Sequence, residues 1–164
     1  MALTTRDDVP ARGVGPRELV GSGHRIALLV LPFLAVGLVL NLAFPTVFAV
    51  GGPPGWLRWL SAAVLGLGLI TWGWSAFLIL TRVPRGRLIV IGPYAVVKHP
   101  LYTGVALLVL PWFGFLLNTW LGVVIGLAMY AGCRIYGRAE ETALAARFGT
   151  AWDSYSAGVR LPWL

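Results

Sequence analysis

The chain has 164 residues, of which 58% are hydrophobic and only 12% are charged. Soluble domains carry about a quarter of charged residues, so the composition excludes an ordinary soluble domain and predicts an integral membrane protein. The net charge of +7 does not indicate a nucleic-acid partner, because the basic residues lie in short flanks between apolar runs, where they set membrane topology and contact anionic lipid headgroups.

A polar stretch opens the chain, and apolar runs separated by short turns follow it. Residues 1–24 are rich in glycine, proline and charge, and we predict a flexible cytoplasmic tail there, followed by a single transmembrane domain over residues 25–164. The first predicted span of this domain covers residues 26–50, with a kink at Pro32, and the second covers residues 56–80.

The second half of the chain predicts a helical hairpin and a surface helix. Residues 100–117 and 120–136 are the third and fourth predicted spans, joined by a short turn. Residues 134–152 then mix charged and apolar residues, which predicts an amphipathic helix that continues from the fourth span and bends along the membrane surface. Its apolar face is expected to carry three residues at i, i+4 and i+8: Leu144, Phe148 and Trp152. Gly149 is a candidate interruption of this helix.

The positive charges are distributed unevenly between the connecting segments. Twelve of the thirteen Lys and Arg residues lie in the tail with its flanking Arg25, in segment 82–98 or in the C-terminal segment, whereas the turns at residues 51–55 and 118–119 have none. The positive-inside rule then places both termini in the cytoplasm. The predicted fold is an all-α integral membrane bundle of about four transmembrane helices plus a C-terminal amphipathic helix.

Residues 92–104, GPYAVVKHPLYTG, gather polar, aromatic and special-backbone residues at the start of an apolar helix. Pro100 suits the first turn of a helix. Lys98, His99 and the ring of Tyr102 are therefore expected at the positive end of that helix, which favours anions. The alternative is a membrane-surface turn in which the tyrosines and the lysine are interfacial anchors.

A helical hairpin after Pro100 would return the chain to the same membrane face. Since both legs rise by about 1.5 Å per residue, Glu140 and Glu141 are expected close to His99. The alternative for the two glutamates is a solvated pair that interacts with nearby arginines. Cys133, the single cysteine, is expected to be a small buried hydrophobic residue.

Four separated elements now stand in a definite order: GPY, KHPLYTG, the glutamate pair after one hydrophobic hairpin, and the terminal FGTAWDSYSAGVRLPWL. In this order they resemble the isoprenylcysteine carboxyl methyltransferase and phospholipid methyltransferase superfamily, over about residues 85–164. Two positions depart from the family pattern. Lys98 stands where the family usually has arginine and so lacks the planar fork that binds a carboxylate in a bidentate manner, and Trp152 stands where tyrosine is common.

The resemblance implies an integral-membrane methyltransferase that uses S-adenosylmethionine, held in a cytoplasmic pocket, with the acceptor entering from the bilayer. The sequence contains no predicted strand followed by a GxGxxG motif, so nothing in it indicates a Rossmann cofactor site. The candidate cofactor-binding residues are Tyr94, Lys98, His99, Pro100, Leu101, Tyr102, Gly104, Glu140 and Glu141. The candidate catalytic residues are His99, Glu141 and Arg160.

Each candidate role has a physical reason. A glutamate can accept hydrogen bonds from the cofactor's ammonium or ribose hydroxyls, and Lys98 with the free N–H groups of the third span can hold its carboxylate. The tyrosine rings offer faces to the adenine or the sulfonium, and Gly104 is expected to leave room for the ligand. His99 could take a proton from an amine or thiol acceptor. Arg160 would neutralise an anionic acceptor, or it would be a headgroup anchor.

The acceptor is expected to be lipidic or small and apolar, with membrane lipids as the other partners. Two further functions are compatible with the sequence. One is a non-enzymatic membrane scaffold or accessory protein, in which the same residues are structural. The other is a membrane reductase of the steroid-reductase type, which is less favoured because the spans hold few polar residues to bind a nicotinamide dinucleotide. No metal site is predicted.

Overall fold

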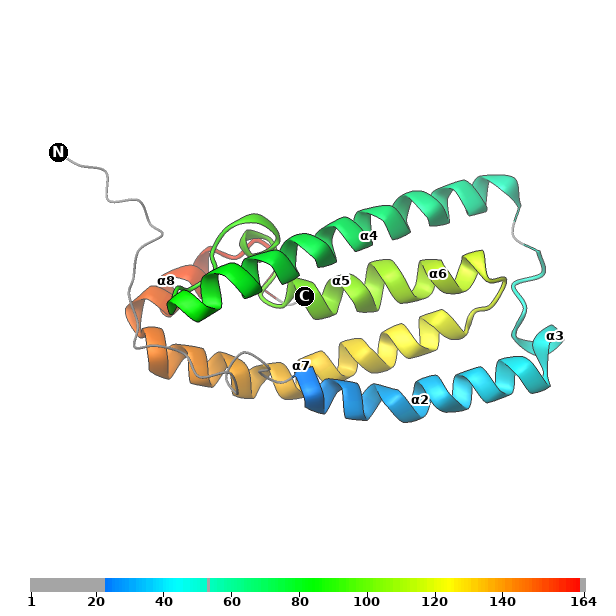
Figure 1. Cartoon of the computed structure of the whole chain (residues 1–164), viewed down its shortest axis with the longest axis horizontal. Helices are drawn as coiled ribbons and strands as arrows, with labels where there is room; N and C mark the ends of the chain where they lie inside the picture. The colour runs from blue at the N-terminus through cyan, green and yellow to red at the C-terminus, as the bar shows by residue number, and fades with distance from the viewer. Residues whose placement is uncertain (1–22, 53, 163–164) are drawn as a thin grey trace.

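The computed structural model describes residues 23–52 and 54–162. Regular secondary structure in these residues is all helical, as predicted, and the one β feature among them is an isolated bridge between Ala49 and Thr119. Of the predicted tail, residues 1–22 lie outside the described residues. The elements in chain order are α2 (Gly23–Ala43), α3 (Pro45–Phe48), α4 (Gly55–Arg82), η1 (Val83–Arg85), η2 (Gly92–Ala95), α5 (Pro100–Gly104), η3 (Val105–Val109), α6 (Leu110–Leu116), α7 (Leu121–Phe148) and α8 (Thr150–Gly158) (Figure 1).

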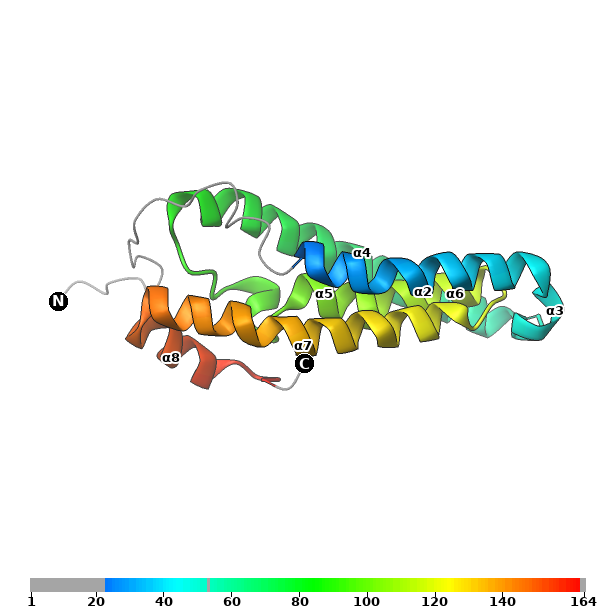
Figure 2. The same cartoon turned by 90° about the horizontal axis from the view of Figure 1, so that it is seen from below.

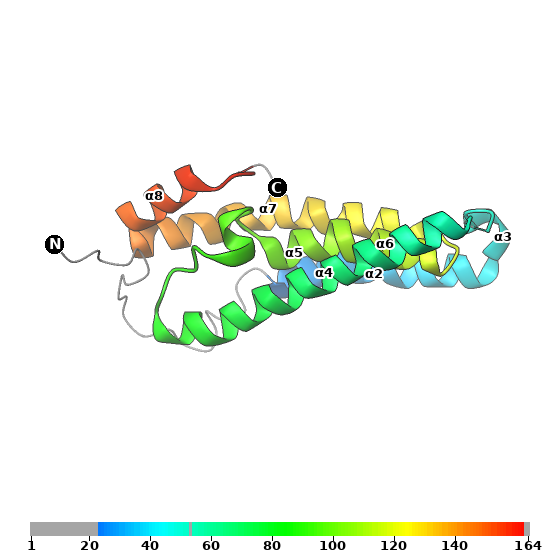
Figure 3. The same cartoon turned by 90° about the horizontal axis from the view of Figure 1, so that it is seen from above.

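The long helices lie side by side in an order that differs from the chain order (Figure 1). Helix α2 packs against α7, α7 packs against α6, and α5 and α6 pack against α4. Helices α4 and α7 have 28 residues each, so each is about 42 Å long, and both extend beyond the start of α2. Figures 2 and 3 show that they diverge at this end, where segment 83–99 and α8 lie.

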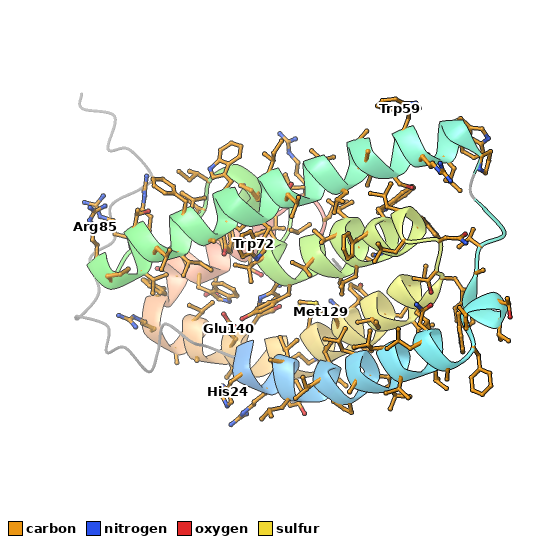
Figure 4. The ribbon with its side chains drawn as sticks, turned by 45° about the vertical axis from the view of Figure 1, so that its right-hand side comes forward. His24, Trp59, Trp72, Arg85, Met129 and Glu140 are labelled. Atoms are coloured by element: carbon orange, nitrogen blue, oxygen red, sulfur yellow. The ribbon has the colours of Figure 1, made fainter. Side chains whose placement is uncertain are left out.

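Two of the described helices are long and apolar enough to cross a membrane, Gly23–Ala43 and Gly55–Arg85, and Pro100–Leu116 is a shorter apolar helix. Large apolar side chains on α2 and α4 are exposed, among them Leu31 and Trp59, and Trp59 points away from the bundle in Figure 4. An apolar exterior of this kind suits lipid rather than water. These observations indicate a membrane-associated helical protein.

The first predicted span is too long at its C-terminal end. Helix α2 continues through Pro32 but ends at Ala43, and the four-residue helix α3 follows it. The break lies at Phe44, whose φ of −133° and ψ of 58° are not helical, because the ring of Pro45 disfavours helical geometry at the preceding residue. The helix predicted over residues 56–80 is confirmed as α4, with its ends shifted by one or two residues.

The helix predicted over residues 100–117 is confirmed, and it contains a π-helical turn. Helices α5 and α6 are continuous through η3, which spans Val105–Val109. Pro111 follows this turn and has no N–H to donate to the preceding turn, so a regular hydrogen-bond ladder cannot run through it.

The predicted bend after residue 136 is wrong. Helix α7 runs without interruption from Leu121 to Phe148, and the chain turns at Gly149, where the predicted interruption is confirmed. Gly149 has a φ of 51°, in the left-handed region that side chains with a Cβ avoid. Trp152 consequently belongs to α8 and does not share one helix face with Leu144 and Phe148.

At the far end of the bundle, the turn between α6 and α7 is joined to the segment between α3 and α4. The Val50 amide donates to the Asn118 carbonyl oxygen (3.3 Å), and the Gly52 amide donates to Asn118 Oδ1 (3.0 Å). The Trp120 amide donates to the Phe48 carbonyl oxygen, and the two rings are 5.2 Å apart. We call this set of contacts the loop clip.

Candidate functional site

The backbone of His99 is fixed at the start of α5. Its carbonyl oxygen accepts hydrogen bonds from the amides of Tyr102 (3.2 Å) and Thr103 (3.0 Å) and from the Thr103 hydroxyl (2.9 Å). Pro100 follows at the first helical position and is fully buried. The His99 and Lys98 side chains are therefore held beside α7. The amides of Tyr102 and Thr103, which were expected to be free for an anion at this helix start, therefore already have a partner.

The predicted meeting of the histidine–proline corner with a glutamate is present. Lys98 Nζ donates to Glu141 Oε2 at 3.0 Å, and His99 Nε2 lies 3.3 Å from Glu141 Oε1. The side chains of Lys98 and His99 are 13% and 11% exposed, and that of Glu141 is 30% exposed. Each carboxylate oxygen thus has one hydrogen-bond partner, and the side chain is still partly exposed to solvent. Since each oxygen has two lone pairs, the carboxylate can accept further hydrogen bonds from a ligand.

These contacts fix the ionisation of Glu141. The hydrogen bond from His99, followed by the hydrogen bond and charge of Lys98, lowers the pKa of Glu141 to about 2 against the opposing effect of burial. Glu141 is therefore an anion at neutral pH. An ionised carboxylate only accepts hydrogen bonds, so Nε2 of His99 carries the donated proton, and in the neutral ring Nδ1 keeps the lone pair.

Gly137 makes room for the His99 ring. A Cβ atom at position 137 would lie 3.1 Å from His99 Nε2, which is closer than ordinary contact. Gly137 stands one helical turn before Glu141, so both residues are on the same face of α7. Gly137 was not among the predicted site residues, although its spacing of four from Glu141 is a signal that could have found it.

The C-terminal segment covers the loop that carries Lys98. The Tyr155 hydroxyl donates to the Tyr94 carbonyl oxygen at 2.9 Å, and the Leu161 amide donates to the Val96 carbonyl oxygen at 2.9 Å. Trp152 is 6% exposed, and its ring lies 6.0 Å from Lys98 Nζ. Burial, with the charge of Glu140, raises the pKa of the Tyr94 hydroxyl, which is therefore neutral.

A pocket of about 180 Å³ lies at this cluster. Its lining residues are Lys98, His99, Cys133, Arg134, Gly137, Arg138, Glu141 and Pro162. Lys98, His99 and Glu141 are the predicted site residues that it brings together. Cys133 is buried, as predicted, and α7 contributes it to the pocket together with two arginines. The α7 residues of the pocket recur at spacings of three or four positions and lead up to Glu141. This spacing could be read from the sequence.

The other predicted site residues lie around this pocket rather than in its wall. Gly104 is buried with Thr71 opposite it, so it packs against α4 instead of leaving open space. The Tyr102 hydroxyl points at Gly23, at the start of α2. Glu140 lies on the side of α7 that faces the bundle (Figure 4). The remaining four are the buried Pro100, the half-buried Tyr94 and Leu101, and the exposed Arg160.

The pocket combines an ionised carboxylate, a lysine and a histidine with a free ring nitrogen. Such a set can bind a ligand that carries both a cationic or hydroxyl group and an anionic group, and it can accept a proton. No family model, curated protein sequence or solved structure matches this chain. The family resemblance of the sequence therefore stays a prediction.

Proposed function

We propose that this chain is an integral-membrane methyltransferase that uses S-adenosylmethionine and methylates a lipidic or small apolar acceptor. The cluster of Lys98, Glu141 and His99 carries the proposal. It joins residues 42 and 43 positions apart in the sequence, and these come from the two segments on which the family resemblance rests. Its partly exposed carboxylate supports a binding role.

The proposed membrane placement uses four spans. Helices α2 and α4 are long and apolar, and the hairpin of α5–α6 with α7 supplies the other two. Segment 83–99, the end of α7 and α8 then lie on the cytoplasmic side with both termini. The cluster would sit at the cytoplasmic rim of the bilayer, where a polar cofactor from solution and an apolar acceptor from the membrane can meet.

The residues present suit the functional groups of S-adenosylmethionine. Glu141 would accept hydrogen bonds from its ammonium or ribose hydroxyls, and Lys98 with Arg138 would face its carboxylate. The bound cofactor supplies an electrophilic methyl group on a sulfonium. The Tyr94 and Tyr102 rings stay candidates for the adenine side of the site.

His99 is placed to handle the acceptor's proton. Because Nε2 points at Glu141, Nδ1 is the atom that would accept a proton from an amine or thiol acceptor. A carboxylate acceptor needs no base, and Arg160 is a candidate to neutralise it. Most of the acceleration is expected from holding the reactants in line, which can supply roughly 7–11 kcal/mol.

Ligand binding tests the proposal directly. We expect the protein purified in detergent to bind S-adenosylhomocysteine, and Glu141→Gln and His99→Ala each to weaken binding at least about tenfold, since each removes a charge-assisted contact of the cluster. Isothermal titration calorimetry measures this. Asp153→Asn, an exposed change on α8, is the matched control and should bind like the wild type.

One observation favours the alternative, a scaffold or accessory protein. Each oxygen of Glu141 already has one partner within the chain, as it would in a purely structural ion pair. If folded protein shows no saturable binding of S-adenosylhomocysteine, the methyltransferase proposal fails and the structural role is favoured. If binding is found, methyl-labelled cofactor and a panel of acceptors would then identify the substrate.

A further inference from the structure

The pocket at the cluster is smaller than a cofactor. Its volume is about 180 Å³, whereas pockets for ligands of drug or cofactor size hold about 300–1,000 Å³. One of its walls includes Pro162, which follows α8 in the chain. A ligand of nucleoside size therefore needs part of this wall to move.

The segment that supplies this wall is separated from α7 by a single glycine. Gly149 separates α7 from α8, has a φ of 51° and a ψ of −127°, is exposed, and has open space where a Cβ would be. A rotation there would break the hydrogen bonds of its amide to Ala145 and of its carbonyl oxygen to the Asp153 amide, but no side chain stands in its way. Glycine can also reach backbone angles that other residues avoid, which suits a hinge.

Two hydrogen bonds and buried apolar side chains hold the segment closed, the latter including Trp152 and Val159, each 6% exposed. The hydrogen bonds of Tyr155 with Tyr94 and of Leu161 with Val96 tie it to the loop of residues 92–99. The Trp152 ring adds its contact with Lys98 Nζ. Tyr155 is half-buried, and its hydroxyl donates one hydrogen bond to a carbonyl oxygen. Removing the hydroxyl therefore leaves no buried charge without a partner.

We propose that residues 149–162 form a hinged roof, which turns about Gly149 to open the pocket and is latched shut by the Tyr155 hydroxyl. The roof itself follows from the contacts above. Its purpose, to admit S-adenosylmethionine and then exclude water from it, rests on the proposed function. In this arrangement Tyr155 is a positioning residue that acts through the loop of Tyr94.

Cys133 offers a reporter that needs no ligand. It is the only cysteine of the chain, it is 2% exposed, and it lines the pocket together with Pro162. We expect Tyr155→Phe to speed the reaction of Cys133 with a maleimide about fivefold. Loss of one hydrogen bond typically changes an equilibrium constant by about this factor, here the one between the closed and the open roof. Labelling rates in detergent, followed by mass spectrometry, measure this.

Tyr136→Phe is the matched control, because it deletes the same hydroxyl from a half-buried tyrosine on α7 outside the roof. It should label at the wild-type rate. The thermal unfolding midpoint of each variant is measured as well. A midpoint well above the labelling temperature shows that labelling reports local opening and not global unfolding. Equal labelling of Tyr155→Phe, Tyr136→Phe and the wild type, with all three folded, would overturn the roof.

A second measurement separates the roof from its proposed purpose. If S-adenosylhomocysteine binds under the roof, it should slow Cys133 labelling in the wild type, and Tyr155→Phe should raise both its association and its dissociation rates in stopped-flow tryptophan fluorescence. Faster labelling in Tyr155→Phe without any ligand effect would uphold the roof and count against the methyltransferase. Ligand binding with identical rates in both proteins would overturn the latch.

Discussion

At the scale of single residues, the absence of a side chain is as important as the charges. His99 reaches Glu141 only because Gly137 leaves space for its ring, one turn before the carboxylate. The lysine departs from the arginine usual in the resembled family, yet Lys98 needs only a point contact with one carboxylate oxygen. A single ammonium meets this geometry, and a planar fork is not required.

We expect Gly137→Ala to push the His99 ring away from Glu141. The new Cβ would be 3.1 Å from Nε2, so the ring or the loop must shift. Overpacking of this kind costs about 1–3 kcal/mol, measured as the free energy of unfolding in detergent relative to a matched glycine-to-alanine change. Binding of S-adenosylhomocysteine should weaken in parallel.

Gly73→Ala on α4 is that matched change, because nothing lies within 4 Å of its Cβ position. It should leave stability unchanged or raise it slightly, since alanine is the better helix former. If the two alanine variants are equally stable, Gly137 does not position His99.

At the scale of elements, residues with special backbones decide where helices end. Pro45 ends α2, Gly149 ends α7, and Asn118 makes the turn between α6 and α7 with a φ of 57°. Asparagine tolerates this left-handed conformation better than most residues. The Asn118 side chain adds an acceptor for the Gly52 amide, so one residue both turns the hairpin and holds the loop clip.

Two substitutions at Asn118 should separate these contributions. Asn118→Gly keeps the left-handed backbone but loses the bond to Gly52, and should cost about 1 kcal/mol. Asn118→Ala loses the bond and also strains the backbone, and should cost about 2 kcal/mol or more. Unfolding in detergent ranks the two variants, and a glycine variant no more stable than the alanine variant would contradict this account.

At the scale of the whole molecule, basic residues gather at the end that holds the cluster. Segment 82–98 and the end of α7 carry most of the described ones, and Arg58 is near the opposite end of α4. The long helices α4 and α7 extend beyond α2 at this same end (Figures 1 and 2). This basic end beside the apolar helices is the arrangement expected where a membrane-associated chain meets lipid headgroups.

The proposed topology predicts the behaviour of reporter fusions. A fluorescent protein fused to the C-terminus should fluoresce, because it folds in the cytoplasm, and alkaline phosphatase fused there should be inactive. Fusions made after Gly52 should behave in the opposite way and serve as the control. An active phosphatase at the C-terminus would show that the cluster faces the other side, away from cytoplasmic cofactor.

The sequence alone determined the features that depend on neighbouring residues. Apolar runs predicted the long helices, and a proline or glycine marked most of their ends. The short turn at Asn118 implied a hairpin, and a hairpin of known rise brings His99 and Glu141 to the same level along the bundle. This is why the centre of the candidate site could be predicted before any coordinates.

Only the tertiary structure decided which way the helices face. Glu141 rather than Glu140 meets Lys98, Gly104 packs against α4, and Trp152 lies on a separate helix over the cluster. Adjacent residues on a helix differ by about 100° in direction, so the rotation of each helix determines which of them meets a neighbour. That rotation, like the turn at Gly149, is set by packing summed over distant segments, which no local pattern contains.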